Sequence, residues 1–166
     1  MKALSLTQPW ASLVACGAKR IETRSWSTAY RGPLAIHAAK AFPRDCRETA
    51  EFDFHFRRFL IEAGYVHRFG GIDVSTLERG AIVATCRVVR CARTELIVSQ
   101  ISDQERAFGD YSSGRWAWLL NDIVRLPEPI TARGALGLWE WERKNEPTTH
   151  TAAGLARAGD TAGQTG

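Results

Sequence analysis

Residues 80–91 read GAIVATCRVVRC, and this stretch decides the fold. Nearly every residue in it is apolar and several are β-branched, which predicts a buried strand. Two further stretches have a similar character: 115–126 (RWAWLLNDIVRL) and 135–142 (ALGLWEWE). In both of them two tryptophans lie two residues apart, so that they share one face of an extended chain. These three segments predict three strands of a β-sheet.

The remaining segments predict short strands separated by helices. Thr7 is placed to cap a helix that ends at Gly17, and apolar spacing predicts a second helix that begins near Asp45 and ends at Gly64. Ser102 is placed to cap a third, short helix that reaches Phe108. Further strands are expected over 2–6, 21–24 and 33–38.

The absence of a βαβ rhythm in this order of elements predicts the fold class. We expect an α+β domain in which about six mainly antiparallel strands curl into a small β-barrel, with two or three helices. The chain has 166 residues, which is enough for one core. We expect one domain over 1–143 and a disordered tail over 144–166, because the tail is rich in Thr, Ala and Gly.

Composition excludes several classes of protein. No apolar run is long enough to span a bilayer, and the start of the chain lacks the features of a signal peptide, so we expect a cytoplasmic protein without membrane contact. The four cysteines form no C-x-x-C pair, and the four histidines show no metal-ligand spacing with them. We therefore expect reduced thiols, no metal and no cofactor.

Basic residues gather in the first quarter of the chain. The net charge is +4, yet residues 1–40 hold six basic residues against one acid, Glu22. The rest of the chain is close to neutral. This asymmetry favours a positive face for a phosphate backbone or an acidic ligand. The alternative is a solvated surface that happens to be basic.

The densest polar cluster is GAKRIETRSW, residues 17–26. If the chain is extended here, Arg20, Glu22 and Arg24 project to one side, and Lys19 at the helix–strand junction can reach the same side. A carboxylate between two guanidinium groups holds them in fixed directions, so the cluster can present cations to a phosphate or accept a hydrogen bond from a base. The alternative is a surface ion-pair ladder that contributes little.

Aromatic residues interleave with these bases. Of the six tryptophans we expect most to lie in the core, and we select Trp26 and Trp116 to stack on unpaired bases. His37 lies within an apolar strand and is expected to be structural. Glu105 and Asp110 are kept in reserve as candidate general bases.

Three strings in the first forty residues resemble the ASCH domain: Leu4-Ser-Leu-Thr-Gln-Pro-Trp-Ala-Ser-Leu, then Gly17-x-Lys19-x-x-Glu22-x-Arg24-Ser25-Trp26, then Tyr30-Arg31-Gly32-Pro33-Leu34. The middle string is similar to that family's signature. The version here especially resembles the ASCH domain at the C-terminus of a eukaryotic transcription coactivator. The resemblance covers about residues 3–142, and a string of this length is specific.

The resemblance implies a PUA-like barrel that binds RNA or single-stranded DNA in a cleft near Lys19, Glu22 and Arg24. Together with the charge and aromatic patterns it gives our expected nucleic-acid-binding residues: Lys19, Glu22, Arg24, Ser25, Trp26, Arg31, Lys40, Arg115 and Trp116.

Some relatives imply an alternative, a hydrolase. One branch acts as an amidohydrolase on a modified nucleoside, acetylated cytidine, and ribonuclease activity is attributed to others. The amidohydrolase branch resembles this chain at Lys19 but has a threonine where Glu22 stands here, and it uses a distant glutamate. If the protein is an enzyme, we expect Lys19 and Glu22 to be its catalytic residues.

Overall fold

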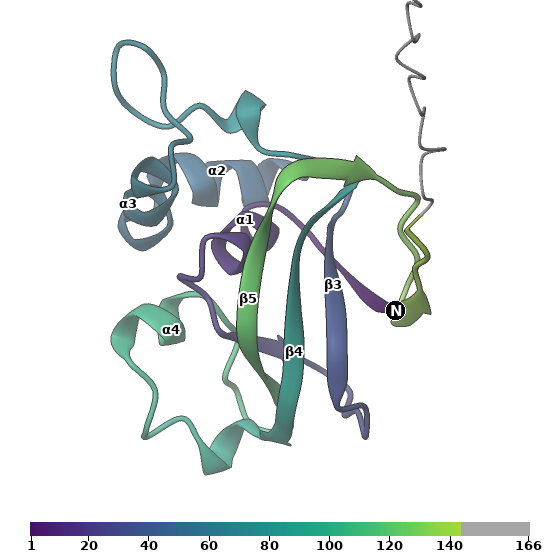
Figure 1. Ribbon diagram of the computed structural model, residues 1–166. Helices are drawn as coiled ribbons and strands as arrows, with labels where there is room; N and C mark the ends of the chain where they lie inside the picture. The colour runs from purple at the N-terminus through teal and green to yellow at the C-terminus, as the bar shows by residue number, and fades with distance from the viewer. Residues whose placement is uncertain (144–166) are drawn as a thin grey trace, which may run out of the picture.

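Six strands form one sheet in the computed structural model, which describes residues 1–143 (Figure 1). Their order across the sheet is β2-β5-β4-β3-β1-β6. The bounds are β1 Lys2–Leu6, β2 Ile21–Arg24, β3 Gly32–Ala38, β4 Ala81–Arg93, β5 Trp116–Thr131 and β6 Leu138–Glu140. All neighbouring pairs are antiparallel except β1 with β3, which is parallel. The expected α+β class with about six mainly antiparallel strands is therefore confirmed.

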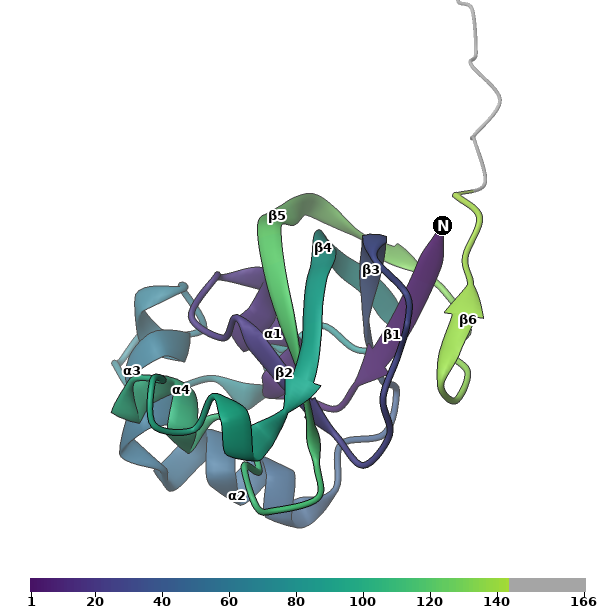
Figure 2. The same cartoon turned by 90° about the horizontal axis from the view of Figure 1, so that it is seen from below.

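The sheet curls into a half-barrel, as the view from below shows (Figure 2). β4 and β5 pair along most of their length, but their register shifts three times, and Asp122 in β5 has a positive φ of 52°. Such bulges bend a strand and increase its twist. The bends let two long strands wrap around the helix that follows β1. The disordered tail expected over 144–166 lies outside the described residues.

Four α-helices lie in residues 1–143, one more than expected. They are α1 Trp10–Ala15, α2 Arg44–Phe52, α3 Phe54–Glu62 and α4 Asp103–Ala107; short 3-10 turns occupy Val74–Thr76 and Thr94–Leu96. The prediction of a single helix between Asp45 and Gly64 was wrong because Asp53 interrupts it. The Asp53 carboxylate accepts hydrogen bonds from the backbone N–H groups of His55 and Phe56, which starts a new helix.

Helix α1 begins differently from the expectation. The predicted cap, Thr7, makes no capping contact; instead the buried side chain of Gln8 accepts a hydrogen bond from the Ser12 N–H (3.1 Å) and donates one to the Glu78 carbonyl (2.6 Å). Gln8 therefore satisfies one free donor at the helix start and ties it to the segment before β4. Thr7 is left free to line the cleft described below.

The core has two main parts on the inner side of the sheet. In the first, α1 packs against inner-face residues of the strands that include Leu4, Ile36 and Trp118. In the second, Leu13 of α1 meets Phe56 and other residues of α3 and α4. Helix α1 therefore stands between the sheet and the other helices (Figure 1), and its N-terminal end forms part of the site.

A small network fixes the loop between β5 and β6 onto the sheet. His37 is 2% exposed, with Nε2 at 3.1 Å from the Ala132 carbonyl and Nδ1 at 3.1 Å from Ser5 Oγ. Trp139 donates its indole N–H to the same hydroxyl. Burial lowers the pKa of His37. Both ring nitrogens thus contact protein groups, in keeping with the expected structural role.

Substituting Gly134→Ala should disturb this network. A Cβ at this position would lie 2.4 Å from His37 Cε1 and 2.8 Å from Ser5 Oγ, so the loop or the ring must move. We expect a loss of about 1–3 kcal/mol in the free energy of unfolding, measured by urea denaturation. Leu136→Ala in the same loop is the control, because that side chain is 99% exposed and should change stability by less than about 0.5 kcal/mol. Equal stability of the two variants would contradict the close packing of this loop.

Candidate nucleic-acid interface

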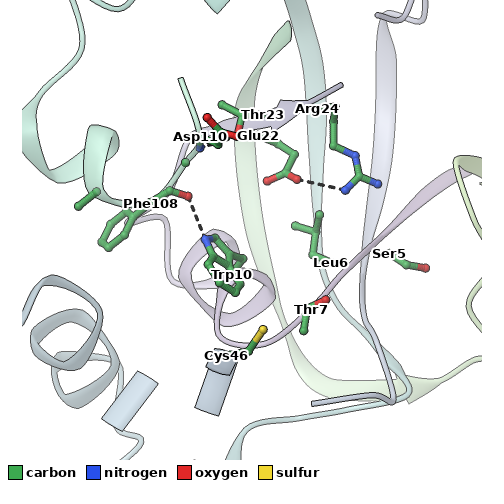
Figure 3. Close-up of a pocket in the computed structure, with 12 residues that line it drawn as sticks. Ser5, Leu6, Thr7, Trp10, Glu22, Thr23, Arg24, Cys46, Phe108 and Asp110 are labelled. Atoms are coloured by element: carbon green, nitrogen blue, oxygen red, sulfur yellow. Dashed lines mark hydrogen bonds and ion pairs between the residues drawn. The ribbon is translucent and has the colours of Figure 1, made fainter. Parts of the chain in front are cut away.

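A cleft of about 470 Å³ opens beside the N-terminal end of α1 (Figure 3). Its walls come from the end of β1, from α1, from β2 and from the connection that follows α4. The residues used below are Leu6, Thr7, Trp10, Glu22, Arg24 and Phe108, all of which line it. The volume lies in the range of small-molecule and cofactor sites.

Strand β2, which carries the signature residues, is held at its start by Glu105. The two carboxylate oxygens of Glu105 accept hydrogen bonds from the backbone N–H groups of Arg20 (2.9 Å) and Ile21 (3.0 Å). Ser102 caps the helix that carries Glu105, as the sequence predicted. Because both oxygens of Glu105 bind backbone, this reserve candidate for a general base positions β2 instead.

Lys19 lies behind the cleft rather than on its surface. Its side chain is 1% exposed, and its amine donates hydrogen bonds to the carbonyls of Ile21 and of Phe108, the latter at 2.9 Å. Its third polar contact is Glu22 Oε2 at 3.5 Å. Two of the three ammonium donors therefore bind backbone carbonyls, and the Glu22 carboxylate lies within ion-pair distance. The amine therefore joins β2, Glu22 and the connection after α4 at a single point.

Glu22 and Arg24 form the polar edge of the cleft. The Glu22 side chain is 8% exposed, and its carboxylate points into the cleft between Trp10 and Leu6 (Figure 3). Its Oε1 lies 3.5 Å from Arg24 Nη1. Within residues 1–143, Glu22 makes only these two long ion pairs, and the buried Nε of Arg24 has no hydrogen-bond partner. The edge therefore retains unused acceptors and an unused donor.

The connection after α4 forms the opposite wall. Trp10 donates its indole N–H to the Phe108 carbonyl at 3.0 Å, and the Asp110 N–H donates to Thr23 Oγ1 at 3.0 Å. Asp110 itself is ion-paired with Arg115 (3.2 Å), and hydrogen bonds from Ser112 lower the pKa of its carboxyl. The wall is tied to both α1 and β2, and Asp110 lies at the rim of the cleft.

A row of aromatic and basic side chains leads away from this edge. Arg24, Trp116 and Arg93 are direct register partners across β2, β5 and β4. The Arg93 guanidinium lies 4.2 Å from the centre of the Trp116 ring, and that of Arg24 lies 5.7 Å from the ring of Trp26. Trp26 also contacts the buried Trp118 edge to face. The structure thus brings the two selected tryptophans next to the signature arginine.

Arg93 escaped the sequence reasoning because only strand pairing places it beside Arg24. The strand predicted over 80–91 stops two residues short of Arg93, and β4 in the structure continues to Arg93. Trp10 and Thr7 were also missed as lining residues, although both belong to the first string that resembles the family.

The other predicted site residues do not line the cleft. Ser25 is exposed just after β2. Arg31 is exposed at the start of β3 and donates to the carbonyls of Thr28 and Tyr30. Lys40 is exposed beyond the opposite end of β3 from Arg31. Arg115, paired with Asp110, flanks the row at Trp116.

Comparisons with known proteins agree with the signature. The model of the ASCH domain family matches residues 4–127. Activating signal cointegrator 1 from Homo sapiens is 46% identical over 54 residues, which are 32% of this chain and 9% of that protein. The Mus musculus protein of the same name gives the same figures. The match therefore spans only a small part of these relatives.

Two solved structures are similar at low identity. The crystal structure of ASCH from Zymomonas mobilis is 15% identical, with a TM-score of 0.48, and the match covers 86% of this chain and 87% of that one. A mutant form of the same Zymomonas mobilis protein is 14% identical, with a TM-score of 0.48, over 86% and 90%. These likenesses are too distant to bear on the site.

The chain belongs to the ASCH domain family, since the family match covers most of it and contains the whole cleft edge. Membership confirms the expected PUA-like class and places the chain among RNA-binding-type modules in general. No helix in the described part of the chain is both long and apolar enough to cross a bilayer. The same residues hold no group of three or more His, Cys, Asp or Glu side chains arranged for a metal ion.

Removal of the Lys19 amine should destabilise the fold more than removal of any exposed lysine. Lys19→Met leaves two carbonyls and a buried carboxylate without their donor. We expect the free energy of unfolding to fall by about 3–5 kcal/mol, measured by chemical denaturation. The exposed Lys40 provides the control, since Lys40→Met should stay within about 0.5 kcal/mol of the unsubstituted protein. A Lys19→Met protein of full stability would show that the amine does not hold the site together.

Proposed function

We propose that the protein binds single-stranded nucleic acid, RNA or DNA, and takes one unpaired nucleotide into the cleft. The observation that carries the proposal is the continuity between an enclosed polar edge, Glu22 with Arg24, and the row formed by Arg24, Trp116 and Arg93. Proteins that bind single strands combine aromatic side chains, on which the bases stack, with cations that contact the phosphates. The row contains both kinds of side chain.

The row offers separate partners for base and backbone. Trp26 is half-buried beside Arg24 and offers aromatic surface to a neighbouring base. The guanidinium plane of Arg93, supported by Trp116, offers a second stacking surface as well as a charge. Arg115 directly precedes Trp116 of the row and is paired with Asp110. Lys19 contributes indirectly, because it positions Glu22.

The shape of the cleft favours an unpaired base. On its polar edge the Glu22 side chain is 8% exposed and the Arg24 side chain is 26% exposed, and the Glu22 carboxylate lies between Trp10 and Leu6 (Figure 3). A base within a duplex cannot reach such an edge without leaving the stack. Unpairing and unstacking that base cost a few kcal/mol, and the cost is smallest for a base that is already single-stranded. We therefore expect single strands to bind more tightly than duplex.

The enclosure of the Lys19 amine favours a binding function over a hydrolytic one. A general base or nucleophile must reach its substrate, and the Lys19 amine is enclosed by three acceptors of the protein. The proposal therefore treats Glu22 as a residue that recognises the ligand.

The test is a titration of labelled single-stranded RNA, single-stranded DNA and duplex, followed by fluorescence anisotropy at two salt concentrations. Arg93→Ala should weaken binding of the single strands by about 5–30-fold, which corresponds to about 1–2 kcal/mol for a charged, stacked contact. It should also reduce the slope of log K against log salt by about 0.7 for each phosphate that the variant no longer neutralises.

Arg58→Ala is the matched control for this loss of charge. Arg58 is an exposed arginine on α3, paired with Glu62, and it does not line the cleft. Its removal should leave affinity nearly unchanged. Equal effects of the two substitutions would reduce the interaction to nonspecific attraction, and an absence of salt-sensitive binding to any strand would refute the proposal.

A further inference from the structure

We propose that the cleft selects guanine among the unpaired bases, by contact of its Watson–Crick edge with Glu22 and Arg24. This inference rests on the proposed binding of single strands and specifies which base enters. It follows from the order of hydrogen-bonding groups along the polar edge: the two oxygens of Glu22 and then the guanidinium of Arg24.

Glu22 supplies two neighbouring acceptors. Oε2 faces the Lys19 amine and Oε1 faces Arg24 Nη1, each at 3.5 Å, so the carboxylate is held at both ends. A carboxylate has about four lone-pair sites, and two long ion pairs leave lone pairs on both oxygens free. Because the side chain is 8% exposed, a ligand has to satisfy them where water has little access.

Arg24 supplies the donor beside them. Its Nη1 is adjacent to Glu22 Oε1, and its buried Nε has no acceptor within residues 1–143. Guanidinium N–H groups cannot accept hydrogen bonds, so a ligand group that contacts this end of the edge has to be an acceptor. Along the edge, the protein therefore presents acceptor, acceptor and donor.

Guanine presents the complementary order on its Watson–Crick edge: the N2 amine, the N1–H and the O6 carbonyl, which are donor, donor and acceptor. Cytosine has a single donor followed by two acceptors, uracil and thymine have one donor between two acceptors, and adenine has one donor beside one acceptor. Held in the same register as guanine, each of these would place an acceptor against the carboxylate of Glu22, and adenine or cytosine shifted by one position would leave one of its oxygens without a donor. Such a mismatch leaves polar groups desolvated and unpaired, which is how a polar site rejects a wrong ligand.

The walls of the cleft suit a flat ring. The Trp10 indole is fixed by its hydrogen bond to the Phe108 carbonyl and by edge contact with Phe56, whose ring centre lies 5.4 Å away. Leu6 lies across the cleft from it (Figure 3). The Glu22 carboxylate enters between these two apolar surfaces, so a base held by that edge is flanked on both sides.

The experiment compares RNA nonamers of uridine that carry guanosine, inosine, adenosine or cytidine at the central position. We expect the guanosine strand to bind at least about tenfold more tightly than the adenosine and cytidine strands, as one bidentate contact provides. Inosine lacks only the N2 amine, so the affinity of the inosine strand should lie between that of the guanosine strand and those of the adenosine and cytidine strands. Free guanosine monophosphate is added as a competitor to separate recognition of a strand from recognition of a nucleotide.

Glu22→Gln tests the carboxylate. A carboxamide offers one acceptor and one donor, so the preference for guanosine should be lost while salt-sensitive binding of all strands remains. Arg93→Ala is the complementary variant and should weaken all four strands by the same factor, with the preference unchanged. If Glu22→Gln fails to fold, the inosine strand still tests the same contact with the unsubstituted protein, because inosine lacks the N2 donor that is proposed to bind Glu22.

Each result has one meaning. Equal, salt-sensitive binding of all four strands overturns guanine selection and leaves the proposed function intact. Binding of none of them overturns both. Guanosine monophosphate that binds as tightly as the guanosine strand upholds base selection and refutes the proposal that the ligand is a strand.

Discussion

A buried ammonium group organises the site of this protein. Lys19 donates hydrogen bonds to the Ile21 and Phe108 carbonyls and is ion-paired with Glu22, and in doing so it joins β2 to the connection that follows α4. A charge removed from water requires such a complete set of partners. The direction of Glu22, the position of the Phe108 carbonyl that anchors Trp10, and hence the width of the cleft all depend on this contact. The lysine of the signature thus shapes the cleft without lining it.

Much of the fold could be predicted from the sequence, because burial leaves a periodic record in the chain. The apolar run that becomes β4 and the tryptophan-rich run that becomes β5 were recognisable as strands, and Ser102 was recognisable as a cap. The break at Asp53 was not foreseen, since one carboxylate that binds two backbone N–H groups outweighs an apolar pattern that continues through it. The capping of α1 by Gln8 was missed for a similar reason: its second bond goes to Glu78, and nothing in the local sequence indicates that partner.

The site was harder to predict than the fold. Alternation along an extended chain placed Glu22 and Arg24 on one side, and the structure directs both into the cleft. The same reasoning treated charge as a sign of exposure, and this failed for Lys19, whose partners are backbone carbonyls that any sequence possesses. Arg93 was invisible for the opposite reason, because only the pairing of β4 with β5 brings it next to Trp116. Contacts between distant segments determine which charged side chains lie together. The composition along the chain does not reveal these contacts.

The clamp that Glu105 places on β2 has a consequence for the order of events during synthesis. The signature residues leave the ribosome within the first quarter of the chain, but the groups that hold them, Glu105 and the Phe108 carbonyl, follow more than eighty residues later. Contacts of such long range form late, because they require closure of a long loop. A nascent chain that ends before α4 therefore carries the family's signature without a site. The proposed site is completed only when the third quarter of the chain docks.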